Sequence, residues 1–246
     1  MPRLVTLLKR LANVYPGWIC RREFQRQKFN RFNERAIEYG YVFNRMAELC
    51  PKRVLDVGTG TTALPHVMRT CGSMVTASDN VRDYWPNGMF NRHYHVIDDD
   101  IRNSRLREKF DLITCISVLE HIQQPDEAVA GMFALLADGG RLILTFPYSE
   151  SAYVHNVYEL PGSSYGQDAA YITQSYSRAD LERWLQQNDG CILMQEYWQC
   201  WDGDFWTVGK QIIPPRRVES HDKHQLTCVL LGKRSTSSPE KVLSHD

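Results

Sequence analysis

Acidic side chains and glycines meet where a short apolar run of the sequence ends. Asp56 lies inside the run Val54–Val57, Gly58-Thr59-Gly60 follows directly, and Asp79 ends the next apolar run. A strand that ends in glycines and leads into a helix presents backbone N–H groups to a ligand, and glycine allows close approach. A carboxylate after the next strand can accept hydrogen bonds from ribose hydroxyls. This spacing predicts a site for a nucleoside-bearing cofactor.

The glycine segment alone leaves the cofactor open. Residues 58–63 read Gly-Thr-Gly-Thr-Thr-Ala, which also satisfies the dinucleotide pattern G-x-G-x-x-A. NAD and S-adenosylmethionine both carry ribose hydroxyls that Asp79 could bind. Other segments must therefore distinguish the two cofactors.

Three segments together resemble the class I S-adenosylmethionine-dependent methyltransferases. They are the pattern Leu55-Asp-Val-Gly-x-Gly60, the acid–hydrophobic pair Asp100-Ile101, and the run 110–122 with its Leu-Glu-His segment, which is common in the small-molecule type. Asp99 is an alternative to Asp100 because residues 98–100 are all acids. The resemblance covers residues 50–147 well and 177–232 in outline.

The resemblance implies S-adenosylmethionine as cofactor and a role for each matched residue. Asp56 would hold the loop around the amino-acid end of the cofactor, Asp79 would bind the ribose hydroxyls, and Asp100 or Asp99 would meet the adenine amine. The full set of expected cofactor-binding residues is Asp56, Gly58, Thr59, Gly60, Asp79, Asn80, Asp99, Asp100, Ile101 and Ser117.

Candidate catalytic residues lie beyond the fourth and fifth expected strands. Methyl transfer needs the nucleophile aligned with the methyl group, and a hydroxyl or amine nucleophile must also lose a proton. His121, Tyr148 and His155 are the candidates for that proton transfer. No metal site is expected, since nothing supplies a ligand set to join His221, Asp222 and His224.

Two long segments, 147–176 and 199–224, are expected to bind the acceptor. They mix aromatic side chains with carboxylates, which suits a sugar ring, a small aromatic molecule or an amine; packing within a lid is the alternative. Their candidates are Tyr148, Glu150, Tyr153, His155, Tyr158, Glu159, Trp201, Asp202, Asp204, Phe205 and Trp206. We expect methylation of an oxygen or nitrogen of a small molecule or glycan.

Other functions remain open at this stage. Nucleic acid is disfavoured as acceptor, because Ser117-Val-Leu-Glu120 stands where DNA amino-methyltransferases carry Asp/Asn-Pro-Pro-Tyr/Phe. An RNA-directed enzyme is an alternative because of the basic N-terminus. A nicotinamide-dependent oxidoreductase and a non-catalytic cofactor-binding module are the others.

Alternating apolar and amphipathic segments predict the elements that carry these residues. The expected strands are 53–57, 74–78, 93–97, 111–116, 141–146, 191–198 and 225–231, with helices at 61–70, 82–88, 103–109 and 125–137. Ser177-Arg-Ala-Asp180 is typical of a capping box that opens a helix to about residue 187. This order predicts an α/β, Rossmann-like, doubly wound, mostly parallel sheet. The resemblance implies seven strands with the last antiparallel.

The first 50 residues are expected to be a helical extension of the same domain, which continues over 51–234 before a flexible tail, 235–246. Leu4, Leu7, Leu8 and Leu11 have helical spacing, Pro16-Gly17 is expected to end that segment, and a longer helix is expected over 21–49.

Charge is unevenly distributed along this neutral chain. Residues 1–36 carry nine Lys and Arg against two acids, so they could contact nucleic acid, a phospholipid surface or a phosphorylated glycan carrier, or form a solvated helix pair against an acidic body. Seven scattered cysteines without a C-x-x-C pair favour a reducing compartment. With no apparent signal peptide, we expect a cytoplasmic protein; the oligomeric state is left open.

Overall fold

The computed structural model describes residues 5, 9–29, 32–85 and 87–234. They fall into two compact units, one within Met1–Asn33 and the other from Glu34 onward. Leu4, Leu7, Leu8 and the expected tail 235–246 lie outside the described residues. No helix of the described part is long and apolar enough to cross a bilayer.

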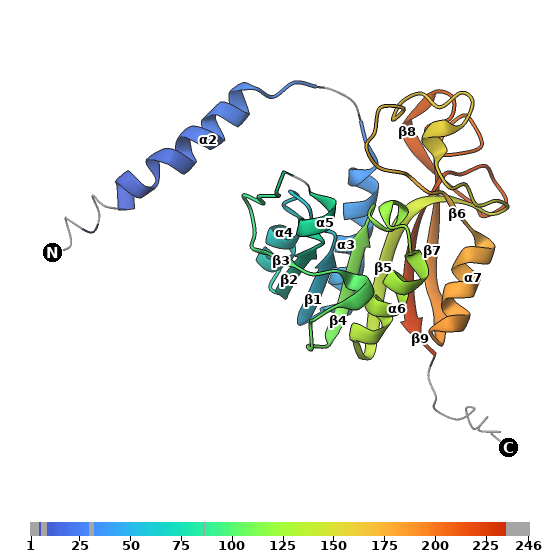
Figure 1. Cartoon of the computed structure of the whole chain (residues 1–246), viewed down its shortest axis with the longest axis horizontal. Helices are drawn as coiled ribbons and strands as arrows, with labels where there is room; N and C mark the ends of the chain where they lie inside the picture. The colour runs from blue at the N-terminus through green and yellow to red at the C-terminus, as the bar shows by residue number, and fades with distance from the viewer. Residues whose placement is uncertain (1–4, 6–8, 30–31, 86, 235–246) are drawn as a thin grey trace, which may run out of the picture. The chain divides into compact units, whose positions relative to one another are not determined.

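A single large sheet organises the second unit (Figure 1), in the order β3-β2-β1-β4-β5-β9-β7-β8, with β6 paired to β5. The strands β1 to β5 are parallel to one another. The bounds of the strands are β1 Arg53–Val57, β2 Met74–Asp79, β3 Val96–Asp98, β4 Phe110–Ile116, β5 Leu136–Ser149, β6 Tyr176–Ser177, β7 Gly190–Trp201, β8 Gln211–Val218 and β9 Leu226–Lys233.

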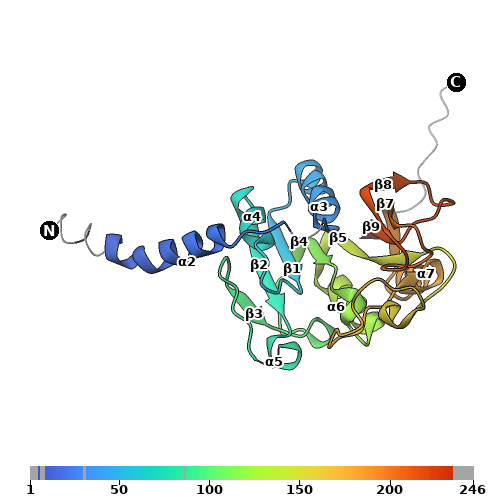
Figure 2. The ribbon, with the colours of Figure 1, turned by 90° about the horizontal axis from the view of Figure 1, so that it is seen from above.

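Helices cover both faces of this sheet, as Figure 2 shows, with α3 and α4 on one side and α6 and α7 on the other. The helices and 3-10 turns are α2 Val14–Gln25, α3 Arg35–Leu49, α4 Leu64–Thr70, α5 Val81–Tyr84, η1 Ile101–Asn103, η2 Leu119–His121, α6 Pro125–Leu135, η3 Val157–Glu159 and α7 Arg178–Gln187. Neighbouring strand residues alternate between the two cores: Leu112 packs with α3 and α4, and Ile113 with α6 and α7. A parallel sheet buried on both faces explains the continuous apolar runs of the sequence.

The expected doubly wound fold is confirmed, including its antiparallel last strand. Strand β9 lies between β5 and β7 and is antiparallel to both. Two strands add to the seven expected ones: the two-residue β6, and the edge strand β8 within the segment expected to be only a connection. Pro214 and Pro215 in β8 cannot donate to a further strand, which suits an edge position.

Local signals were correct for some helices and wrong for others. The capping box of α7 is present, with the Ser177 hydroxyl and the Asp180 carboxylate satisfying each other's backbone N–H groups. No α-helix forms over 103–109; the short turn η1 replaces it. The single helix expected over 21–49 is two helices, α2 and α3. Helix α2 also includes Pro16, because its first turn tolerates a residue without an N–H.

Candidate active site

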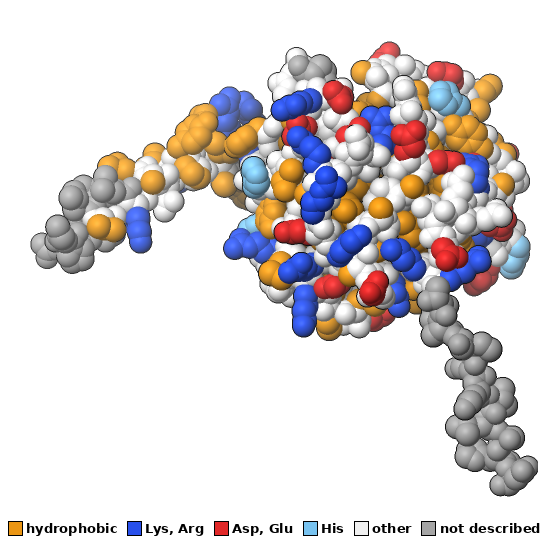
Figure 3. Space-filling view, turned by 60° about the horizontal axis from the view of Figure 1, so that its bottom comes forward, with side chains coloured by type: hydrophobic (Ala, Val, Ile, Leu, Met, Phe, Trp, Pro, Cys, Tyr) orange, Lys and Arg blue, Asp and Glu red, His pale blue; other side chains and the backbone are white. Residues whose placement is uncertain are grey.

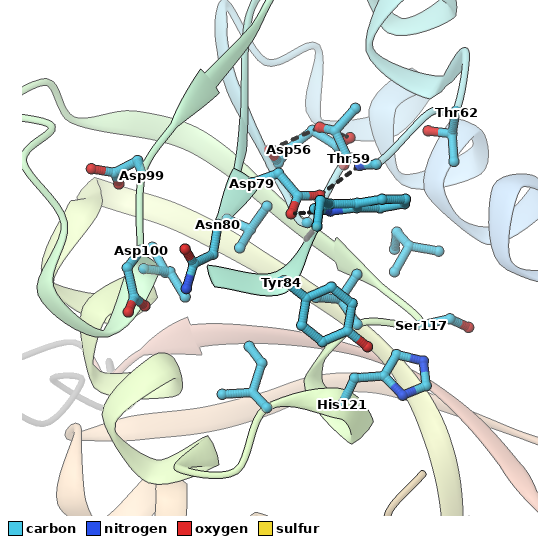
Figure 4. Close-up of a pocket in the computed structure, with 18 of the residues that line it drawn as sticks. Asp56, Thr59, Thr62, Asp79, Asn80, Tyr84, Asp99, Asp100, Ser117 and His121 are labelled. Atoms are coloured by element: carbon cyan, nitrogen blue, oxygen red, sulfur yellow. Dashed lines mark hydrogen bonds between the residues drawn. The ribbon is translucent and has the colours of Figure 1, made fainter. Parts of the chain in front are cut away.

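A cavity of about 530 Å³ opens at the carboxyl ends of β1, β2 and β4 (Figure 4). Its size is within the usual range for small-molecule and cofactor sites. All ten residues expected to bind the cofactor line it: Asp56, Gly58, Thr59, Gly60, Asp79, Asn80, Asp99, Asp100, Ile101 and Ser117. They converge because parallel strands bring their carboxyl ends to one edge of the sheet.

Asp56 braces the loop that follows β1. The side chain is almost fully buried, and its two carboxylate oxygens accept hydrogen bonds from the hydroxyls of Thr59 and Thr114, both at 2.7 Å. Burial raises the pKa of Asp56 to about 6, although both hydroxyl contacts oppose this. The carboxylate therefore fixes the loop from beneath.

The glycine loop does not present the free N–H groups that the sequence suggested. The amides of Gly58 and Thr59 donate to the Ser78 carbonyl, and the amide of Gly60 donates to Asp79 Oδ2 at 2.7 Å. Gly58 has φ +72°, and a Cβ there would lie 2.3 Å from a methyl of Val118. Glycine at 58 is therefore required for packing against Val118 rather than for ligand approach.

Asp79 sits at the end of β2 and accepts two hydrogen bonds from the protein. Besides the Gly60 amide, the indole N–H of Trp85 donates to Oδ1 at 3.0 Å. Figure 4 shows both contacts. A carboxylate offers about four acceptor sites, so acceptor capacity remains for a ligand.

Asp99 and Asp100, which the sequence could not distinguish, have different surroundings. Asp99 is buried, and its carboxylate accepts from the Ser104 hydroxyl and the Arg105 amide. Asp100 caps η1 and is paired with Arg102, which lowers its pKa, but its side chain remains 29% exposed. Asp100 is thus the acid that keeps more surface for a ligand.

His121 lies at the other end of the cavity from the acids Asp99 and Asp100 (Figure 4). Its Nδ1 is 2.8 Å from the carbonyl oxygen of Ile172, which only accepts, so Nδ1 carries the proton and Nε2 keeps its lone pair. Burial lowers the pKa of His121. This side chain can accept a proton at neutral pH.

Glu120, next to His121, is a buried acid. Its Oε2 has no hydrogen-bond partner among the described residues, and its Oε1 lies 4.0 Å from His121 Nε2. Burial raises the pKa of Glu120 well above its usual range. The local environment therefore favours the neutral carboxylic acid.

Glu38 of α3 ties this helix to the carboxyl ends of β4 and β5. The buried carboxylate accepts from the hydroxyls of Ser117 and Thr145 and pairs with Arg35 at 2.9 Å. Ser117 lines the cavity, but its hydroxyl points to Glu38 and is engaged there. The hydroxyl of Ser117 is therefore not free to donate to the cofactor, and only the other atoms of this residue could contact it.

Tyr148 and His155, the other two candidate catalytic residues, do not line the cavity. Tyr148 is fully buried, and its hydroxyl donates to Glu150, which is held by Arg178. His155 is exposed and contacts the Tyr153 hydroxyl at 3.2 Å. The structure therefore does not bring these two residues to the cavity that holds His121, and their catalytic role stays a prediction.

Most aromatic residues of the two long segments pack against one another instead of lining the cavity. Val157, Tyr158, Trp201 and Trp206 share one apolar cluster with Phe205 at its border. The acceptor residues proposed from these segments, including Glu159, Asp202 and Asp204, are absent from the cavity lining. The aromatic residues thus pack as the alternative interpretation expects, and an acceptor-binding role for these segments stays a prediction.

Several lining residues were not predicted from the sequence. Arg35 and Tyr39 come from consecutive turns of α3, Tyr84 and Trp85 follow β2, and Tyr171 comes from the irregular segment before β6. The i, i+4 spacing of Arg35 and Tyr39 could have indicated one helix face, but nothing local shows which face meets the cavity.

The polarity of the cavity discriminates between cofactors. Five aspartates line it, Asp56, Asp79, Asp83, Asp99 and Asp100, against Arg35 and Arg102, which pair with Glu38 and Asp100. The glycine-loop amides are already engaged. A pyrophosphate needs donors and positive charge, whereas ribose hydroxyls, amines and a sulfonium suit acceptors. The residues present therefore fit S-adenosylmethionine and not a dinucleotide.

Among the described residues, no group of three His, Cys, Asp or Glu could hold a metal ion.

A family model described as a methyltransferase domain matches residues 24–190 of the chain. This chain belongs to that family, as a class I S-adenosylmethionine-dependent methyltransferase. Among curated proteins it is 29% identical over 120 residues to the ubiquinone biosynthesis O-methyltransferase of Haemophilus ducreyi, which covers 44% of this chain and 51% of that protein. The mitochondrial counterpart of Schizosaccharomyces pombe is 29% identical over 102 residues, 38% of this chain and 37% of that protein. The chain thus matches about half the length of these relatives or less.

Solved structures share the fold at low sequence identity. The 1,6-didemethyltoxoflavin-N1-methyltransferase of Burkholderia thailandensis has a TM-score of 0.54 at 16% identity, covering 96% of this chain and 91% of that one. An S-adenosylmethionine-dependent methyltransferase of Clostridium acetobutylicum has a TM-score of 0.51 at 15% identity, covering 93% and 100%. These likenesses support the fold alone.

Proposed function

We propose that this protein transfers the methyl group of S-adenosylmethionine to a hydroxyl oxygen of a small, flat organic molecule. The observation that carries the proposal is one cavity that joins the aspartates at the ends of β1 and β2 to His121 and three tyrosines. The aspartates suit the cofactor, and the aromatic side chains with His121 suit a planar acceptor. The partly matching O-methyltransferases support oxygen as the nucleophile.

The aspartates and Ile101 would each contact a different part of the cofactor. Asp79, at the end of β2, would accept hydrogen bonds from the ribose hydroxyls, and Asp100 with Ile101 would meet the adenine. The loop braced by Asp56 would follow the methionine portion. When bound, S-adenosylmethionine supplies an electrophilic methyl carbon on a positively charged sulfur, and the aspartates favour that charge.

The acceptor would lie against Tyr39, Tyr84 and Tyr171, which line the cavity together with His121. Aromatic side chains pack well on a planar ring, and such rings prefer offset or edge contacts, as His121 and Tyr171 already make at 4.6 Å. His121 Nε2 would take the proton of the attacking hydroxyl, while the Ile172 carbonyl holds the ring orientation through Nδ1.

The test is labelled methyl transfer with defined acceptors. The full chain is incubated with methyl-labelled S-adenosylmethionine and three matched panels: phenols and catechols, aromatic amines, and sugars. We expect label in the phenol or catechol panel. Label only in amines or sugars would refute the oxygen acceptor while leaving methyl transfer intact.

Calorimetry separates the cofactor assignment from the acceptor. We expect S-adenosylhomocysteine to bind and NAD to show no heat, because the loop amides are engaged and the cavity carries five aspartates. Binding of NAD without binding of S-adenosylhomocysteine would overturn the proposal.

A further inference from the structure

The N-terminal unit displays an apolar stripe that its own residues do not bury. Leu11, Val14, Tyr15 and Trp18 follow the spacing i, i+3, i+4, i+7, and each is more than half exposed. Asn13 between them keeps αR backbone angles, so the stripe continues into α2. Helix α2 has no buried residue. A helix face of this kind ordinarily packs against something apolar.

Basic side chains accompany the stripe along the chain. The described residues 9–29, which we name the basic segment, contain Lys9, Arg10, Arg21, Arg22, Arg26 and Lys28 against the single acid Glu23. With about 100° per residue, Arg10 and Arg21 fall beside Val14 on the helix circumference. Arg22 lies over the ring of Trp18, with its guanidinium carbon 5.1 Å from the ring centroid.

The stripe and its accompanying basic residues have the composition of a helix at a lipid–water interface. Tyr and Trp place an apolar ring and a polar edge together, and the long arginine stem can follow apolar surface while its charge stays in water. Figure 3 shows apolar atoms along this helix with Lys and Arg beside them. Phe24 and Phe29 add two more exposed aromatic rings to the segment.

We propose that the basic segment, residues 9–29, binds the surface of an anionic phospholipid bilayer with its helix in the plane of the membrane. The excess of five positive charges complements such a surface. A second copy of the same segment would be repelled by that charge. The cations could also bind the phosphates of a nucleic acid. The aliphatic side chains of Leu11 and Val14 would add nothing there, because they neither stack on bases nor bind phosphate. This binding is independent of the methyl acceptor.

Co-sedimentation of the full chain with vesicles tests the proposal. One vesicle set is pure phosphatidylcholine, and the other contains about one third phosphatidylglycerol. We expect the chain to sediment with the anionic set at low ionic strength and to be released by about 0.5 M salt. Equal partitioning to both sets, or none to either, would overturn the proposal.

Two variants separate the charge from the apolar stripe. Arg21→Glu with Arg22→Glu should weaken partitioning at least about 25-fold, since each cation near an anionic surface contributes about fivefold. Leu11→Ser with Trp18→Ala should weaken it at least about tenfold with the charge unchanged. Unchanged partitioning of either variant contradicts the proposal.

Matched controls carry the same changes in the second unit. Phe90→Ala removes an aromatic ring that is 79% exposed, and Arg107→Glu reverses an exposed charge. Both should partition like the unaltered chain, and all variants should keep their affinity for S-adenosylhomocysteine, which reports an intact second unit. Binding to single-stranded RNA that survives loss of Leu11 and Trp18, without vesicle binding, would assign the segment to nucleic acid instead.

Discussion

The indole N–H of Trp85 donates a hydrogen bond to Asp79 Oδ1, while the Gly60 amide donates to Oδ2. The Trp85 ring also lies beside Gly60, where a Cβ would come within 3.4 Å of it. Trp85 therefore fixes the carboxylate that ends β2 from one side, and the glycine loop fixes it from the other.

Trp85→Phe should weaken S-adenosylhomocysteine binding about tenfold. Phenylalanine keeps a smaller aromatic ring, but a hydrogen bond to a charged acceptor worth roughly 1.5 kcal/mol is lost and the carboxylate can turn away. Calorimetric titration measures the change. Unchanged or tighter binding would mean that the indole competes with the ligand for Asp79 instead of orienting it.

Asp79→Asn should weaken the same affinity more strongly, by roughly 10- to 100-fold. The amide keeps the shape of the side chain but loses one acceptor oxygen and the charge that strengthens hydrogen bonds from hydroxyls. Asp138→Asn, an exposed acid of β5, is the matched control and should bind normally. If both variants bind equally well, Asp79 does not contact the ligand.

The sequence predicted which residues line the proposed cofactor end of the cavity, because that end consists of strand ends. Asp56 lies near the end of one apolar run, and Asp79 and Asp100 come at the ends of the next two. A parallel sheet brings such ends together without further information. The proposed acceptor end depends on α3 and on the segment before β6. Arg35 and Tyr171 reach the cavity only through tertiary packing, which no local pattern encodes.

The position of Tyr148 depends on where the fifth strand ends, and the sequence placed that end too early. The fifth strand was expected to end at Phe146, which left Tyr148 free to face a substrate. Strand β5 continues to Ser149, so Tyr148 keeps the alternation of Leu142, Leu144 and Phe146 and joins the same core. A strand that continues three residues further thus buries a side chain that was expected to act.

The pH dependence of methyl transfer should report His121. Burial lowers its pKa, so the neutral base persists below pH 6.5 and activity should fall only at lower pH. His121→Gln should lose roughly 100-fold in kcat/KM and lose that acidic limb. His155→Gln, at an exposed histidine, should keep both rate and profile. An acidic limb that survives in His121→Gln would assign it to another group.

Glu38→Ala should lower the free energy of unfolding by about 2–4 kcal/mol. The change leaves the hydroxyls of Ser117 and Thr145 without their acceptor. It also removes an ion-pair partner of Arg35, but the Arg35 side chain is partly exposed, so the loss of that pair costs less than it would in a fully buried site. Glu108→Ala, at an exposed loop acid, should cost less than about 0.5 kcal/mol. Urea unfolding compares the two, and equal midpoints would show that Glu38 does not tie α3 to β4 and β5.

Glu120→Gln should stabilise the protein increasingly as the pH rises. Because burial raises the folded-state pKa of Glu120, its stability contribution is complete below the unfolded-state pKa and is lost as the pH rises through the folded-state value. Glutamine cannot ionise, so it escapes that loss. The difference from the unaltered chain should be near zero at pH 4 and reach at least about 1 kcal/mol at pH 8, or roughly 2–4 °C in Tm.

Thermal unfolding between pH 4 and pH 8 measures this difference, with Glu182→Gln, at an exposed glutamate, as control. Parallel curves for Glu120→Gln and the unaltered chain would show that Glu120 ionises in the folded protein at no cost. That result would contradict the pKa shift expected from the burial of its carboxyl group, whose Oε2 has no hydrogen-bond partner among the described residues.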